Sequence, residues 1–298
     1  MTGVDVFSAS RERYLGPFGG DGVFCVGNAD ECDHYTEDGA VRIPWGRAPR
    51  PEDKARIRSL ALCPTPAQLS KAVLPAYLPD LVNLSSLTVP ARLLAHLKSS
   101  TLTSLVIGND DGQAPPLPLA ADTALPALRG LLWVSSFTTP RLPQVVDPLP
   151  PLKFLRTNVS GDVAVLRQLA TLPSLRHLEV VDVKNFDVVD HLVAPLQALE
   201  IGGTGRDFPV ARLAAIPTLE SLRLNGVRAE IDCSVFPALP DLSQLTILNS
   251  KRIVNVEALL ECPKLASIMV VDCGNPFKKA GKKLFEAHGF AELDIKYS

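Results

Sequence analysis

The sequence has little net charge, few aromatic residues and no long hydrophobic run. Its 298 residues contain 30 Lys and Arg against 32 Asp and Glu, which gives a formal net charge of −2. This balance lacks the basic excess that is typical of proteins that bind nucleic acids or membrane surfaces, so we expect neither partner. Aromatic residues make up 6% of the chain and there are 26 prolines, which predicts an aliphatic core between many short connections.

No segment approaches the roughly 18–20 apolar residues of a transmembrane helix. Residues 1–14 carry charges and no uninterrupted apolar stretch, so they do not resemble a signal peptide. The cysteines lack the close spacing of a disulfide framework or a zinc site; they are Cys25, Cys32, Cys63, Cys233, Cys262 and Cys273. We therefore expect free thiols and a cytoplasmic protein.

The common catalytic signatures are also missing. The sequence contains no G-x-S-x-G, H-E-x-x-H, P-loop or C-x-x-C motif. Its five histidines are dispersed along the chain, so no metal site can be assembled from them. We therefore predict a non-enzymatic protein with no cofactor and no metal.

What the chain has in abundance is a leucine repeat. The template L-x-x-L-x-L recurs between residues 57 and 295, with weaker copies at both ends. Its clearest copies begin at Leu84, Leu102, Leu128, Leu152, Leu175, Leu196, Leu219, Leu242 and Leu265. From Leu131 onward the second template leucine returns every 21–25 residues, most often after 23. Such a steady period indicates stacked structural repeats.

Each template copy predicts a short β-strand whose alternate residues point to one side. One such strand cannot cover its own apolar side, so neighbouring repeats must stack. Amphipathic segments at residues 162–169, 210–215 and 256–261 precede strands and are followed by Pro or Cys, which predicts short helical or 3-10 turns. Residues 276–287 predict a last helix that Gly289 stops.

This pattern resembles the leucine-rich-repeat family over residues 55–298. The resemblance implies an α/β solenoid of about 10 or 11 repeats of about 23 residues. Its curved parallel β-sheet would line the concave side, and short helices or 3-10 segments would line the convex side. The Asn or Cys that family repeats usually carry three residues beyond the last strand leucine is degenerate, with valine at 183 and 227, so no subfamily is assigned.

Residues 1–54 lack the template and are predicted to form a small N-terminal cap. They contain four glycines between residues 16 and 22, and an Asp38-Gly39 pair between Tyr35-Thr36 and the segment 41–43. An Asp-Gly pair between such segments is typical of a β-hairpin. A cap of this kind would shield the apolar face of the first repeat.

The residues between the template leucines are the candidates for function, because the resemblance places them on the open concave face. Four successive strands carry charges in this column, flanked by aromatic, imidazole and amide side chains. This mixture is typical of an interface centre, so we predict a protein-binding patch. The alternative is that opposite charges in the column simply pair with one another. The candidates are Phe154, Arg156, Asn158, His177, Glu179, Glu200, Arg223 and Asn225.

Leucine-rich-repeat proteins usually bind other proteins through this face, so the resemblance implies a protein-interaction scaffold of adaptor or inhibitor type. One version is an immunity-type antagonist that clamps a toxin or an enzyme. A second hypothesis is self-association through an apolar column at Val106, Leu132 and Val134. A third is a glycoside-acting enzyme with Glu179 and Glu200 as its carboxylate pair, which an open sheet without water-excluding walls disfavours.

Overall fold

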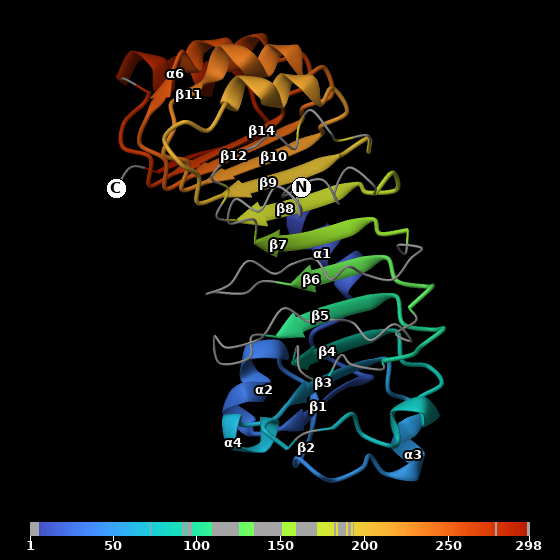
Figure 1. The fold of residues 1–298 in the computed structure, drawn as a ribbon. Coiled ribbons are helices and arrows are strands. Elements are labelled where there is room, and N and C mark those ends of the chain that lie inside the picture. Colours follow the sequence, from blue (N-terminus) through green and yellow to red (C-terminus); the bar gives the residue numbers. More distant parts are fainter. Residues whose placement is uncertain are drawn as a thin grey trace. The chain divides into compact units, whose positions relative to one another are not determined.

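The computed structural model describes residues 6–71, 73–90, 93, 97–108, 125–133, 151–158, 172–181, 183, 189, 192, 194–277 and 279–296. The chain divides into two compact units. The N-terminal unit is Ala9–Thr157, and the C-terminal unit is Asn158–Ser298 together with Met1–Ser8. Each unit is built on parallel strands (Figure 1).

The N-terminal unit has its strands in the spatial order β2-β1-β3-β4-β5-β6-β7. They are β1 (Val23–Gly27), β2 (Val41–Ile43), β3 (Ser59–Cys63), β4 (Ser86–Pro90), β5 (Ser104–Gly108), β6 (Gly130–Trp133) and β7 (Phe154–Asn158). Its described helices are short, and α1 begins in the residues of the other unit. They are α1 (Val6–Leu15), α2 (Ala29–Tyr35), α3 (Pro51–Lys54), α4 (Pro66–Leu69) and η1 (Leu78–Asp80).

The C-terminal unit repeats one strand and one 3-10 segment. Its strands, in spatial order, are β8 (His177–Val181), β9 (Ala198–Gly202), β10 (Ser221–Asn225), β12 (Gln244–Leu248), β14 (Ser267–Val271) and β15 (Glu292–Lys296). The helical segments are η4 (Val210–Ala215), η5 (Cys233–Ala238), η6 (Val256–Glu261) and α6 (Lys279–His288). A small second sheet pairs β11 (Ile231–Asp232) with β13 (Ile253–Val254). No helix in the described ranges has the length and apolar character needed to cross a bilayer.

The strands coincide with the leucine template. In the C-terminal unit the second template residue of each strand pairs with its equivalent on the next, as Leu222 does with Leu245 and Leu245 with Ile268. The segments predicted at 210–215 and 256–261 are the 3-10 helices η4 and η6, while the segment predicted at 162–169 lies outside the described residues. The chain therefore has the predicted leucine-rich-repeat fold, with the template residues buried between the sheet and the 3-10 segments.

The predicted β-hairpin in the cap is wrong. The strand that precedes Asp38-Gly39 is β1, and helix α2 lies between β1 and the turn. As a result β2 pairs parallel to β1, with Phe24 opposite Val41, and β1 in turn pairs parallel to β3. The sequence did not indicate β1, because its residues, VFCVG, do not match the leucine template. The proposed boundary between residues 54 and 55 stays a prediction.

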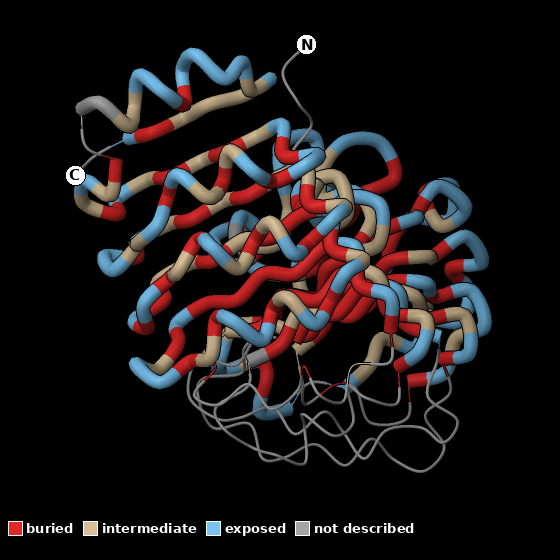
Figure 2. The backbone as a smooth tube through the Cα atoms, turned by 90° about the horizontal axis from the view of Figure 1, so that it is seen from above, coloured by how far each residue is buried: buried red, intermediate tan, exposed pale blue. Residues whose placement is uncertain are grey.

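Hydroxyl and thiol groups form some of the loop hydrogen bonds that the Asn or Cys beyond the last strand leucine would otherwise form. Ser250 Oγ accepts a hydrogen bond from the Val227 amide at 3.0 Å, and Thr204 Oγ1 accepts one from the Arg228 amide at 3.2 Å. The Cys273 thiol donates to the Ile247 carbonyl at 3.3 Å. Buried loop amides need such partners. Figure 2 shows the outcome, with buried residues concentrated on the strands and exposed ones on the loops and helical segments.

Candidate functional site

The concave face of the C-terminal unit is the face of its sheet opposite the 3-10 segments. Side chains alternate between the two faces of a strand. In β12 and β14 the second and fourth residues are buried, while the first, third and fifth are half-exposed on the concave face. The half-exposed residues are Gln244, Thr246, Leu248, Ser267, Met269 and Val271. This alternation agrees with the predicted register and leaves this part of the face open.

Strands β8 and β9 depart from the alternation, because both of their faces are covered. The first four residues of β8 and all five of β9 are buried. His177, Glu179 and Glu200, which the sequence places on the concave face, are 1%, 0% and 5% exposed. A side chain from the start of helix α1, Phe7, forms part of the cover and is itself 1% exposed.

Phe7 packs directly on the predicted charged column. Its ring centroid lies 5.0 Å from that of His177, in an edge-to-face arrangement. The Arg223 guanidinium lies over the Phe7 ring, 4.2 Å from the ring centroid. A cation over an aromatic face is stabilised by the ring quadrupole, by about 2 kcal/mol where the pair is desolvated. Phe7 therefore covers the part of the concave face formed by His177 and Arg223.

The polar side chains in contact with Phe7 are paired. His177 Nε2 lies 2.9 Å from Glu179 Oε1, and Arg223 Nη1 donates to Glu200 Oε2 at 3.3 Å. The second contact is one of the pairs that the self-pairing alternative predicts. Buried charges need such partners, because breaking a buried pair costs about 3–5 kcal/mol. The His177–Glu179 and Arg223–Glu200 contacts therefore lie together beside Phe7.

In the N-terminal unit, the last turn of α1 packs on the concave face of the sheet. Leu15 forms a buried apolar cluster with Val106 and Phe154. The carbonyl oxygen of Leu15 accepts hydrogen bonds from Ser86 Oγ at 2.7 Å and from Ser104 Oγ at 2.8 Å. The two serines thereby satisfy a carbonyl at the helix C-terminus that has no partner within the helix.

Gly130 in β6 provides the room for this helix. A Cβ atom at Gly130 would lie 2.1 Å from the carbonyl oxygen of Tyr14. The Tyr14 ring in turn stacks on Phe154, with centroids 6.4 Å apart. The concave column at Ser86, Ser104 and Gly130 is therefore small because the helix lies against it. This run of small residues is the sequence signal from which the cover could have been inferred.

Replacing Gly130 with Ala is expected to destabilise the N-terminal unit by roughly 1–3 kcal/mol, because the new methyl group overlaps the Tyr14 carbonyl. Urea unfolding monitored by circular dichroism measures this loss. The matched control is Gly281→Ala in α6, where a Cβ meets nothing within 4 Å. Adding alanine to a helix interior is expected to stabilise by about 0.5–1 kcal/mol. The same sign for both substitutions would contradict the close approach at Gly130.

The structure divides the eight predicted residues into groups. Four are buried, namely Phe154, His177, Glu179 and Glu200. Three are half-exposed, namely Arg156, Arg223 and Asn225. Asn158 ends β7, and its side chain lies outside the described residues. The expectation of exposure is wrong for the buried four, because the segment that precedes the repeats packs on this face, with Phe7 on His177 and Leu15 on Phe154.

The carboxylate pair of the glycosidase hypothesis is present but enclosed. Glu179 and Glu200 are register partners on β8 and β9. Both are buried, and their oxygens contact His177 and Arg223. Glycoside hydrolysis needs space beside the carboxylates for the sugar and for water. The structure therefore disfavours this hypothesis.

The apolar column proposed for self-association is covered as well. Val106 is 5% exposed and packs with Leu15. Leu132 is half-buried against the same cluster, and Val134 lies outside the described residues. Val106 therefore offers no exposed apolar surface for self-association through this column.

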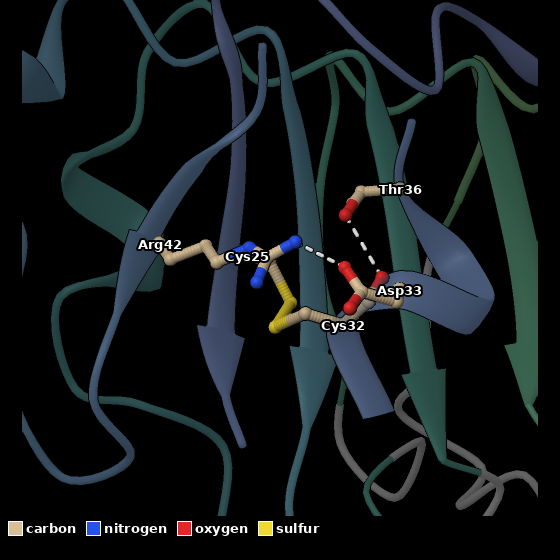
Figure 3. The surroundings of a disulfide bond; sticks show 5 residues. All are labelled: Cys25, Cys32, Asp33, Thr36 and Arg42. Carbon is tan, nitrogen blue, oxygen red and sulfur yellow. Dashed lines mark hydrogen bonds and ion pairs between the residues drawn. A yellow bond between two sulfur atoms is a disulfide. The ribbon is translucent and has the colours of Figure 1, made fainter. Parts of the chain in front are cut away.

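Two of the six cysteines are paired, which corrects the expectation of free thiols throughout. Cys25 in β1 and Cys32 in α2 form a disulfide bond (Figure 3). The sequence did not indicate this disulfide, because neither β1 nor α2 was recognised from the sequence. The other four cysteines form no disulfide and are buried; they are Cys63, Cys233, Cys262 and Cys273. Because disulfides persist mainly in oxidising compartments, the cysteines no longer support a cytoplasmic location.

The sequence matches no known family model, and it matches no curated protein. In structure the chain is similar to an internalin (inlF) from Listeria monocytogenes strain 4b F2365, with 14% sequence identity and a TM-score of 0.42. The match covers 90% of this chain and 76% of the internalin chain. The leucine-rich-repeat description therefore rests on the strand register and the 3-10 segments given above.

Proposed function

We propose that the chain is a non-catalytic scaffold that binds a partner protein on the concave face of its C-terminal unit. The observation that supports this function is the open part of that face, where alternate residues of β12 and β14 are half-exposed. Stacked repeats create extended surfaces of this kind, which repeat proteins use for binding. The residues involved come from consecutive strands, so their spacing is set by the sheet rather than by mobile loops.

The chemistry of this surface suits a protein partner. Leu248 and Met269 are half-exposed on neighbouring strands, and a methionine side chain adapts readily to an irregular partner surface. Arg223 lies at one margin, while Asp294 and Lys296 form an ion pair of 2.7 Å at the other. An apolar centre with a polar rim is the usual arrangement of an interface. The expected partner therefore presents an apolar strip with charged residues on both sides.

Of the residues first predicted, Arg223 and Asn225 lie at the margin of the proposed surface. His177 and Glu179 would join it only if Phe7 moved away. An adaptor and an inhibitor, including an immunity-type antagonist, would use the same surface. The activity of the bound partner separates them, because an inhibitor abolishes that activity and an adaptor leaves it unchanged.

Introducing a charge at the centre of the proposed surface is expected to weaken partner binding strongly. Met269→Glu would replace an apolar side chain at the centre of the surface with a carboxylate. Central interface residues commonly contribute 2 kcal/mol or more, which is about a 30-fold change in Kd. The partner is first captured from native lysate with wild-type protein, then purified, and its Kd is measured by calorimetry with each variant.

The matched control is Ala211→Glu, which adds the same charge at an exposed position on η4, on the opposite side of the repeats. Its Kd is expected to equal that of the wild type. Both variants must show wild-type thermal unfolding. A partner that binds Met269→Glu as tightly as wild type, or that is lost equally with Ala211→Glu, would rule out binding on this surface.

A further inference from the structure

We propose that Cys25, Cys32 and Cys63 form a binding site for a soft, thiolate-preferring cation such as Cu(I). The site becomes able to bind the ion when the Cys25–Cys32 disulfide is reduced. The three residues come from β1, α2 and β3. Their sulfur atoms all lie within 4.8 Å of one another. Three sulfurs at such mutual distances can contact one ion together, whereas an isolated disulfide brings only two.

The strand register explains why the sulfurs converge. Cys25 lies opposite Ala61, and Gly27 lies opposite Cys63, in the parallel pair of β1 and β3. Cys25 and Cys63 are therefore on the same face of the sheet. A Cβ at Gly27 would lie 2.0 Å from the Cys63 carbonyl oxygen, so only glycine permits this close approach.

Helix α2 brings the third sulfur onto that face. The Asn28 amide, just before the helix, donates to the Cys63 carbonyl at 3.3 Å. Thr36, the residue that follows the helix, donates from its Oγ1 to the Cys32 carbonyl at 2.8 Å. Arg42 of β2 pairs with Asp33 of α2 (Figure 3). These contacts do not involve the disulfide, so they can hold Cys32 near the other two sulfurs after reduction.

The surroundings favour a soft ion with three ligands. Cys25 and Cys32 are fully buried and Cys63 is 3% exposed, in a cluster with Ala61 and the half-buried Tyr35. Among the described residues, no histidine or carboxylate joins the three sulfurs in this group. Thiolates bind both Zn²⁺ and Cu(I), but structural zinc sites take four protein ligands, whereas Cu(I) also accepts three thiolates in a plane. The site therefore fits Cu(I) better than Zn²⁺.

The chemistry requires reduction before binding. A dithiol gives two electrons to the disulfide, which breaks the Cys25–Cys32 bond and yields two thiols, while the dithiol becomes a disulfide. Cu(I) then forms three metal–sulfur bonds, and the three thiols release three protons to water. Because Cys25 and Cys32 form either the disulfide or two of the metal–sulfur bonds, the disulfide and the metal complex exclude each other. Metal binding at this site is thus controlled by redox state.

The remaining cysteines provide internal controls. Burial raises the pKa of the Cys233 thiol to about 12 and that of Cys262 to about 11. Burial is also the main cause that raises the pKa of Cys273. These thiols stay protonated near neutral pH. In the described residues they belong to no group of three potential ligands, so they are expected to leave the Cu(I) affinity unchanged when substituted.

The test is an anaerobic titration of the reduced full-length chain with Cu(I) against a chromophoric Cu(I) chelator. Wild type and Cys233→Ala are expected to bind one ion with equal affinity. Cys63→Ala removes one of the three ligands, so its affinity is expected to fall by more than the roughly 10–100-fold that loss of a ligand-orienting partner costs. The oxidised protein is expected to lose the site. Unchanged affinity in Cys63→Ala, or in the oxidised protein, would overturn the proposal.

A second measurement uses wild-type protein alone and does not depend on how the variants fold. Reduced protein is alkylated with iodoacetamide, with and without one equivalent of Cu(I), and each cysteine is quantified by mass spectrometry. Cu(I) is expected to protect Cys25, Cys32 and Cys63 together and to leave the other three unaffected. Protection that misses Cys63, or that extends equally to Cys233, would show that the ion binds elsewhere.

Discussion

Replacing Leu245 with Asp is expected to unfold the C-terminal unit under conditions in which the wild type is folded. Leu245 is 1% exposed and lies in register between Leu222 and Ile268. Truncating a buried leucine costs about 2–5 kcal/mol, and burying an unpaired carboxylate adds to that cost. The sum approaches the total stability of about 5–15 kcal/mol that is typical of a protein. Thermal unfolding followed by circular dichroism measures the effect.

The control for this substitution is the adjacent residue. Thr246→Asp introduces the same side chain one position further along β12, where it is half-exposed and lies opposite Arg223. A surface change of this kind usually alters stability by less than about 0.5 kcal/mol. Equal losses at 245 and 246 would contradict the strand register. The equivalent residue of β8, Glu179, would be a poor control, because it is fully buried beside His177.

Replacing Phe7 with Ala is expected to uncover the charged column of the C-terminal unit. Phe7 is 1% exposed and contacts both His177 and Arg223. Loss of a buried phenylalanine side chain costs about 3–5 kcal/mol, and it also admits water to the polar cluster. The expected results are a lower urea midpoint and faster hydrogen exchange at the amides of β8 and β9.

Glu12→Ala is the matched control, because Glu12 is exposed on the same helix. This variant is expected to keep the wild-type urea midpoint and the wild-type exchange rates. If Phe7→Ala also left the exchange of β8 and β9 unchanged, Phe7 would not be part of the cover over these strands.

The Phe7→Ala variant also bears on how a partner binds. A partner confined to the open strands β12 and β14 is expected to bind wild type and Phe7→Ala with equal affinity. A partner that must displace Phe7 to reach His177 and Glu200 would bind the variant more tightly, because the competing contact has been removed. The ratio of the two Kd values therefore defines how far the binding surface extends beneath the N-terminal segment.

The sequence by itself determined the repeat architecture. The leucine template places Leu222, Leu245 and Ile268 at equivalent positions, and the structure pairs them in the predicted register. The segments at 210–215 and 256–261 are helical as predicted. These features depend on the period-two alternation of a strand and on the distance between repeats, both of which are local properties of the chain. The Glu200–Arg223 pair follows from the same register.

The tertiary structure alone decided which segment covers the concave face. Phe7 lies far from Arg223 in the chain, and no periodicity connects them, so their contact could not be read from the repeats. The same holds for the meeting of Cys63 with the Cys25–Cys32 disulfide, which required an unrecognised strand and a helix folded back on it. Periodic patterns specify which face of an element is apolar. Which distant segment packs on the other face depends on long-range complementarity. In this chain the N-terminal segment contacts Phe154, His177 and Arg223 of the predicted binding patch.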